Sequence, residues 1–188
     1  MTKEIPFEPH PFWDFSLAVY GTVGVAPACL DLQDRRGIDV NMLLFCLWAG
    51  CDRALAFDME GIRSILETSG DWQRTVVQPM RAVRRRLKLG SRHLGGDITE
   101  GLRTQLLATE IACEHGEQLI IAAAADGVSF ATREMKPAAA VAANLAAYAA
   151  SAGIRLDAAD ATALEAVLAA RLEGDEIAAV LDAVLATD

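Results

Sequence analysis

Four basic side chains at helical spacing are the residues of this sequence best suited to bind a charged group. Arg81, Arg84, Arg85 and Lys88 stand at positions i, i+3, i+4 and i+7, which places them on one face of an α-helix. Guanidinium groups bind phosphate oxygens or carboxylates through paired hydrogen bonds. We therefore predict that this face binds an anion or an acidic partner.

The charge around these residues is distributed unevenly. Residues 74–92 hold seven of the 17 basic residues and no Asp or Glu, whereas the rest of the chain has 10 basic and 26 acidic residues, a formal charge of −16. Such asymmetry steers anionic partners toward one face, within a screening length of about 8 Å at physiological ionic strength. The alternative is a solvated face whose arginines pair with the chain's own carboxylates. The sequence leaves both interpretations open.

A second candidate is a pair of carboxylates one helical turn apart. Asp31 and Asp34, in the string DLQDRRG, are spaced to share one Mg²⁺ ion and hold a diphosphate. The string is loosely similar to the first aspartate-rich motif of all-helical prenyl-diphosphate enzymes, and Asp157 and Asp160 would supply the second. The string lacks the usual doubled aspartate, however, and the chain is shorter than those enzymes. A solvated helix end is the preferred interpretation, with a magnesium site as the alternative.

Cysteine, histidine and aromatic residues offer fewer possibilities. The four cysteines form no CxxC pair and the three histidines lie in separate segments, so we predict free thiols and no cofactor. Trp13, Phe15, Tyr20 and Trp48 are candidates for the wall of a ligand pocket between helices. Aromatic residues at helical spacing are more often part of the core, and this is the interpretation we adopt.

Composition and charge exclude several classes of protein. With 53% hydrophobic and 23% charged residues, the chain is not disordered. A net charge of −9 argues against general nucleic-acid binding, because most of the surface would repel a phosphate backbone. No window of 18 apolar residues free of charge occurs, and the N-terminus lacks the runs of a signal peptide. We therefore expect a cytoplasmic protein without a membrane span.

Helices must position the candidate residues, because capping residues and apolar residues recur at helical spacing throughout. The first half of the chain predicts helices over residues 11–20, 27–36, 40–57, 59–68 and from 71 onward. The stretch 40–57 is almost free of polar residues after its predicted cap, Asp39, and is expected to be the central buried helix. In the helix from Asp71, Pro79 is expected to cause a kink, and the arginines are expected to lie opposite an apolar stripe that packs on the core.

The second half predicts further helices after a loop at residues 90–96. A helix is expected to run to about Glu114, where Gly116 breaks or bends it, and Val128–Thr132 is the only segment expected to be extended. Pro137 begins an alanine-rich part that is expected to form a helical hairpin over residues 137–188. We predict one all-α domain over residues 1–188, an irregular or orthogonal bundle of about eight to ten helices with negligible strand.

Three segments of the first half resemble an uncharacterised proteobacterial family of unknown function. They read FWDFSLAVY, GVAPACLDLQDRRGIDVNMLLFCLW and WQRTVVQPMRAVRRRLK, and they are long and rich in residues that rarely coincide by chance. The resemblance implies a small bacterial cytoplasmic protein and supplies no activity or catalytic residue. Residues 1–136 form the family-like core, and residues 137–188 lie outside the pattern.

These observations favour two functions of different classes. The first is a regulatory or interaction module that presents the basic helix, residues 74–92, to an acidic protein segment or a phosphate-bearing small molecule. The second is a magnesium-dependent enzyme or carrier for a phosphorylated or diphosphate small molecule, with Asp31 and Asp34 as metal ligands. We adopt the first, and the sequence does not fix the oligomeric state.

Overall fold

The chain folds into packed α-helices, as the sequence predicts. A computed structural model describes residues 5–128 and 132–185. Its helices are α1 (Pro11–Tyr20), α2 (Val25–Arg36), α3 (Val40–Cys51), α4 (Met59–Trp72), α5 (Gln78–Lys88), α6 (Gly96–Asp126), α7 (Pro137–Ala152), α8 (Ala161–Leu168) and α9 (Gly174–Val184). Two-residue strands β1 (Leu55–Ala56) and β2 (Thr132–Arg133) pair antiparallel. The all-α prediction is confirmed; of the segment expected to be extended, residues 129–131 lie outside those described.

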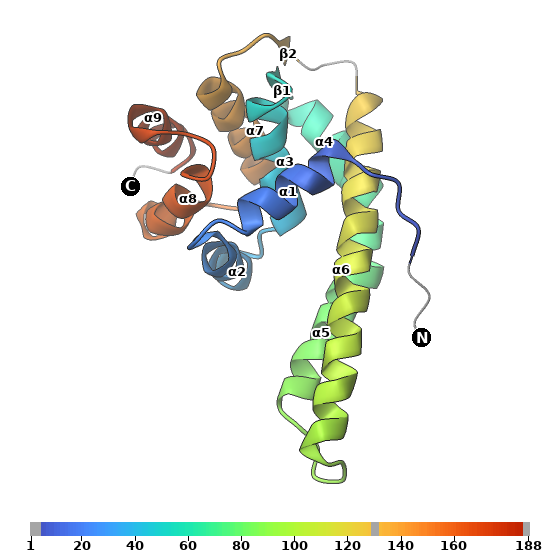
Figure 1. Ribbon diagram of the computed structural model, residues 1–188. Coiled ribbons are helices and arrows are strands. Elements are labelled where there is room, and N and C mark those ends of the chain that lie inside the picture. Colours follow the sequence, from blue (N-terminus) through green and yellow to red (C-terminus); the bar gives the residue numbers. More distant parts are fainter. Residues whose placement is uncertain (1–4, 129–131, 186–188) are drawn as a thin grey trace.

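The central helix is α3, and both its burial and its cap agree with the sequence. The Asp39 side chain accepts a hydrogen bond from the Asn41 backbone N–H at 2.9 Å, which satisfies a free donor of the first turn. Ten of the helix's residues are buried, and Phe45 and Cys46 are fully inaccessible. Helices α1, α6 and α7 pack around it (Figure 1).

The end of α3 differs from the sequence prediction. The helix stops at Cys51 instead of Phe57, because Ala54 takes the left-handed conformation, with φ of 51°, and turns the chain into β1. The buried Asn144 on α7 then accepts a hydrogen bond from Phe57 N at 2.8 Å and donates one to Leu55 O at 2.9 Å. The Asn144 side chain thus supplies hydrogen-bond partners for the Phe57 N–H and the Leu55 carbonyl, which would bond to other backbone groups if the helix continued.

Helices α4 and α5 form one continuous path, although the sequence predicts a break at Ser69-Gly70. A π-helix over Gln73–Val77 joins them. Pro79 follows directly and has no N–H, so in a regular α-helix the Thr75 carbonyl would lose its donor. The wider turn, in which Gln78 N donates to Gln73 O, changes the hydrogen-bond spacing just before the proline. The kink expected at Pro79 stays a prediction, and the irregularity that the structure shows just before the proline is the π-turn.

A two-helix arm is the most conspicuous part of the molecule (Figure 1). We use this name for residues 78–111, which comprise α5, the following loop and the first half of α6. The arm extends away from the other helices, and α5 has no buried residue. The prediction that the apolar stripe of this helix packs on the core is therefore wrong: Val83 is 49% exposed, and Val77, in the π-helix, is buried instead.

Helix α6 also runs further than the sequence suggests, from Gly96 through Gly116 to Asp126. Gly116 was expected to break or bend it, but the helix runs through this residue. Trp72 lies against the helix at this point: a Cβ atom at Gly116 would lie 3.6 Å from its ring, an ordinary contact distance, and the Trp72 indole donates to Cys113 O at 3.0 Å. Trp72 thus packs α4 against α6 at the position of the glycine.

The alanine-rich C-terminal part packs on the central helices. Helix α7 contacts α3 along its length, α9 lies on α7, and α8 lies on α2 (Figure 1). Among the described residues no single helix is long and apolar enough to cross a membrane. Helices α1 and α2 reach the required length and composition only when taken together, and they are bent by 98°.

Candidate functional site

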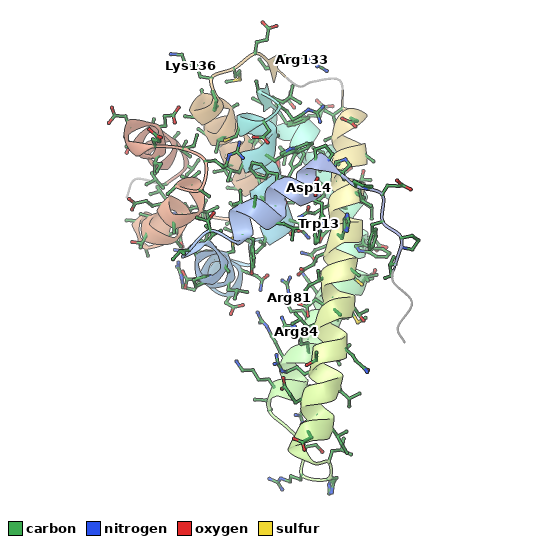
Figure 2. All side chains as sticks on the ribbon, in the orientation of Figure 1. Trp13, Asp14, Arg81, Arg84, Arg133 and Lys136 are labelled. Atoms are coloured by element: carbon green, nitrogen blue, oxygen red, sulfur yellow. The ribbon has the colours of Figure 1, made fainter. Side chains whose placement is uncertain are left out.

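The arginines of α5 face a cleft between the arm and the rest of the molecule. Figure 2 shows Arg81 and Arg84 on the side of the arm that is turned toward α2. Both guanidinium groups pair with the carboxylate of Glu110 on α6, Arg81 through Nε at 3.2 Å and Arg84 through Nε and a terminal nitrogen. Glu110 is only 2% exposed, so these pairs are largely shielded from solvent.

Arg81 also joins three helices. Its two terminal nitrogens donate to Gln33 on α2 and to Glu114 on α6, so every nitrogen of the group has a partner. Burial opposes the ionisation of Glu110, but Arg84 and Arg81 hold the pKa of this carboxyl below its usual value. Burial raises the pKa of Glu114 despite the nearby Arg81. The cluster therefore balances two guanidinium groups against two carboxyl groups of the chain itself.

The other two predicted site residues lie apart from this cluster. Arg85 pairs with Asp34 of α2 at 2.6 Å on a more exposed surface, and Lys88 has no ion-pair partner among the described residues. Three of the four predicted basic residues are thus engaged by the chain's own carboxylates, as the alternative interpretation supposed. That the four residues bind a partner stays a prediction.

The aspartates proposed as magnesium ligands are likewise engaged by arginines. Asp31 pairs with Arg35 at 2.6 Å, and Asp34 pairs with Arg85. These hydrogen bonds hold the pKa of both carboxyls below the usual value. No group of three or more His, Cys, Asp or Glu side chains placed to hold a metal ion occurs in residues 5–128 and 132–185. The arrangement does not favour the magnesium alternative.

The second aspartate motif does approach the first, with arginines between them. Arg35 contacts both Asp31 and the fully buried Asp160, at 2.8 Å from the latter. Arg36 binds Asp157 at 2.7 Å and Asp160 at 2.9 Å. Two guanidinium groups therefore stand where a bound cation would have to lie, and they tie α2 to the start of α8. The role is structural, since removing one partner would leave a buried charge unpaired.

The cleft itself has a volume of about 250 Å³ and is lined by five elements. Its walls are mostly apolar and its floor is polar. The lining includes Leu17, Tyr20, Leu30, Arg81, Ile111 and Gln118. Trp13 and Tyr20 line it as well, whereas Phe15 and Trp48 are buried in the core. The core interpretation of the four aromatic residues thus holds for two of them.

A buried polar network lies behind the floor of the cleft. Gln118 Nε2 donates to Asn41 Oδ1 at 2.9 Å, and Asn41 Nδ2 donates to Glu117 Oε2 at 2.6 Å. The charge of Asp39 lies close enough to Glu117 to raise the pKa of its carboxyl group. This network was not predicted from the sequence. The available signal was weak: polar residues one after another, at 117 and 118, on an otherwise apolar part of α6.

Comparison with protein families supports the resemblance seen in the sequence. Residues 11–121 match the family described as a protein of unknown function (DUF2390). The chain belongs to this family. The match covers every residue that lines the cleft in this DUF2390 protein, and α7, α8 and α9 lie outside it. No curated protein and no solved structure matches the chain.

Glu117 of this DUF2390 protein is completely buried, and burial of a carboxyl group favours its neutral form. Burial and the charge of Asp39 raise the pKa of Glu117 from 4.5 to about 9. Burial raises the pKa of Asp39 too, but the backbone N–H groups of Asn41 and Met42 stabilise its charged form. We therefore assign the proton to Glu117 and the charge to Asp39, at the N-terminus of α3, where the helix dipole favours an anion.

This assignment predicts that the DUF2390 protein loses stability as the pH rises from about 5 to about 9. A group whose pKa is higher in the folded state stabilises the protein fully below its unfolded pKa and no longer does so above its folded pKa. The loss is at most about 1.4 kcal/mol per pH unit for one proton. Urea unfolding at pH 6 and pH 9 measures it. Glu117→Gln, which has a similar shape and does not ionise, is expected to remove most of the slope; an unchanged slope would place the proton elsewhere.

Proposed function

We propose that the protein is a non-enzymatic interaction module whose arm tip binds an acidic segment of another protein. The observation that carries the proposal is the exposure of apolar side chains along the arm. Seven of the fourteen large hydrophobic residues exposed in the described chain belong to it: Val83, Leu89, Leu94, Ile98, Leu102, Leu107 and Ile111. Apolar surface gathered in this way is typical of protein interfaces.

Charge at the tip supports an acidic partner. Leu89 at the tip is 80% exposed, and three basic residues lie within three positions of it in the sequence: Arg86, Lys88 and Arg92. None of the three pairs with a carboxylate among the described residues, and Arg86 donates to Gly90 O instead. They remain free to attract an anionic surface, unlike Arg81 and the other inward-facing arginines. The proposed binding surface therefore lies at the end of the basic helix, whereas the sequence predicted it in the middle of that helix.

Other expectations accompany this proposal. The protein is proposed to act in the cytoplasm, to need no cofactor and not to bind nucleic acid generally. The four cysteines are free and two of them, Cys29 and Cys46, are buried. Burial raises the pKa of Cys29 to about 12, which suits an unreactive core thiol. Free thiols are the usual state in a reducing compartment.

Photo-crosslinking from the arm tip tests the proposal. With a benzophenone amino acid in place of Leu89, illumination of a lysate of the source organism is expected to give a specific adduct, whose partner peptide is acidic by mass spectrometry. Lys88→Gln together with Arg92→Gln should reduce the adduct severalfold, and so should added salt, because the attraction is screened. The matched control carries benzophenone in place of Val23, which is 99% exposed and lies outside the arm, between α1 and α2.

Three outcomes would contradict the proposal. The first is the same adducts from position 23 as from position 89, which would show random collision. The second is an adduct unchanged by Lys88→Gln and Arg92→Gln, which would show that charge plays no part. The third is an adduct with a second copy of this chain, which would make the arm a self-association surface.

A further inference from the structure

The floor of the cleft holds a hydrogen-bond acceptor that the described residues leave unused. Gln118 is 3% exposed and lines the cleft. Its amide nitrogen is held by Asn41, which fixes the orientation of the group, and its oxygen Oε1 accepts no hydrogen bond within the described chain. Buried polar atoms are rarely left without a partner, so an unused acceptor on a residue that lines a cleft points to a ligand that donates.

The charges beside this acceptor favour a cation over an anion. Each nitrogen of Arg81 already donates to a side chain of the protein, and Arg84 is paired with Glu110. An anionic ligand would have to displace these partners. The lining holds three carboxyl groups, those of Asp39, Glu110 and Glu114, against two guanidinium groups. The lining therefore has a surplus negative charge and an unmet acceptor.

The walls above the floor suit a short apolar body. Leu17, Leu30 and Ile111 are 54%, 44% and 43% exposed although they line a cleft, so apolar surface there remains to be covered. Tyr20 and Trp13 add aromatic rings, whose faces attract cations. Trp13, labelled in Figure 2 beside α6, is held by the ring of His115, with which it stacks at 4.1 Å between centroids and 4° between planes.

From these observations we propose that the cleft binds a small organic cation, a primary ammonium group on a short aliphatic or aromatic body. The ammonium group donates to Gln118 Oε1 and to the carboxylate of Glu114, while the body covers Leu17, Leu30 and Ile111. A cleft of about 250 Å³ sets the size to that of a small metabolite amine. This site lies at the root of the arm and does not depend on the function proposed for its tip.

An isosteric series of ligands tests the chemistry of the head group. Hexylamine and 1-hexanol share a hexyl chain, hexanoate has six carbons including its carboxylate, and the three differ in charge and in donor groups. Saturation-transfer NMR with the full chain is expected to show binding of hexylamine at least about tenfold tighter than that of 1-hexanol, since a charge-assisted hydrogen bond is the stronger one. Hexanoate is expected to be the weakest. Equal binding of amine and alcohol, or stronger binding of hexanoate, overturns the proposal.

Variants then locate the site. Gln118→Met removes the acceptor at similar volume, and Ile111→Trp fills the cleft from its partly exposed wall; each is expected to weaken hexylamine binding at least about tenfold. Gln105→Met, an exposed position on the opposite side of α6, is the control and should bind as the wild type does. Thermal unfolding verifies that each variant is folded.

Failure of this proposal is distinct from failure of the arm-tip function. If Gln118→Met unfolds, Ile111→Trp still decides, because its side chain is 43% exposed. Hexylamine that binds Ile111→Trp as tightly as the wild type overturns the proposal. Lys88→Gln with Arg92→Gln is expected to leave hexylamine binding unchanged, and a loss there would place the amine at the tip and overturn the cleft assignment.

Discussion

Replacing Glu110 by alanine is expected to destabilise the protein by about 3 kcal/mol, the lower end for a broken buried ion pair. The carboxylate is almost inaccessible and is the shared partner of Arg81 and Arg84. Its loss leaves two guanidinium groups facing a cleft wall with one fewer negative charge. The lower end applies because both arginines are partly exposed, at 16% and 23%. Urea unfolding at neutral pH measures the change.

Two further variants separate charge from packing. Glu100→Ala removes a carboxylate from the same helix, but its pair with Arg103 is exposed, so the cost is expected to be below about 1 kcal/mol. Replacing Glu110, Glu114, Arg81 and Arg84 together by methionine removes the charges on both sides and is expected to recover most of the lost stability. A single Glu110→Ala variant as stable as Glu100→Ala would show that the arginines find other partners.

Gly50→Ala is expected to be the second severe substitution, again costing about 3 kcal/mol, at the upper end for overpacking. Gly50 lies where α3 crosses α7. An added Cβ atom would lie 2.5 Å from Val141 Cγ2 and 2.7 Å from the Val141 backbone N. The side chain can move, but the backbone contact requires the two helices to separate, and this pair forms the centre of the core. Thermal and urea unfolding measure the loss.

A matched glycine and a compensating variant make this prediction specific. Gly70 in α4 has no atom within 4 Å of an added Cβ, so Gly70→Ala should stabilise the protein by about 1 kcal/mol through helix propensity. Adding Val141→Ala to Gly50→Ala removes the side-chain contact only, and a partial recovery is therefore expected. A full recovery would mean that the helices move apart at little cost.

Local signals in the sequence predict where helices begin better than where they end. The start of α3 follows from Asp39, whose side chain needs only the next two residues to cap the helix. Its end depends on Asn144, distant in the chain, which holds the extended backbone. Gly116 was misread for the same reason: a glycine inside a helix looks like a break until Trp72 is placed against it.

The candidate site shows the same limit. The charge pattern alone identified Arg81 and Arg84 as unusual. Their carboxylate partners, however, lie 26 to 33 residues further along the chain, so the sequence did not reveal that the two arginines face inward. The amphipathic pattern wrongly predicted that Val83 packs on the core and that the arginines lie on the opposite face. Glu117 and Gln118 gave almost no signal, since a buried polar side chain is recognisable only from its surroundings.

The π-helix between α4 and α5 determines the direction in which the side chains of α5 point around the helix axis. One residue more or less in a helix turns the following side chains by about 100° around the axis, and the wide turn at Gln73–Val77 has one residue more per turn than an α-helix. A regular helix through this point would carry Arg81 and Arg84 away from Glu110 and present other residues to the cleft. The direction in which the charged face of the arm points therefore depends on a single additional residue in the π-helix that precedes it.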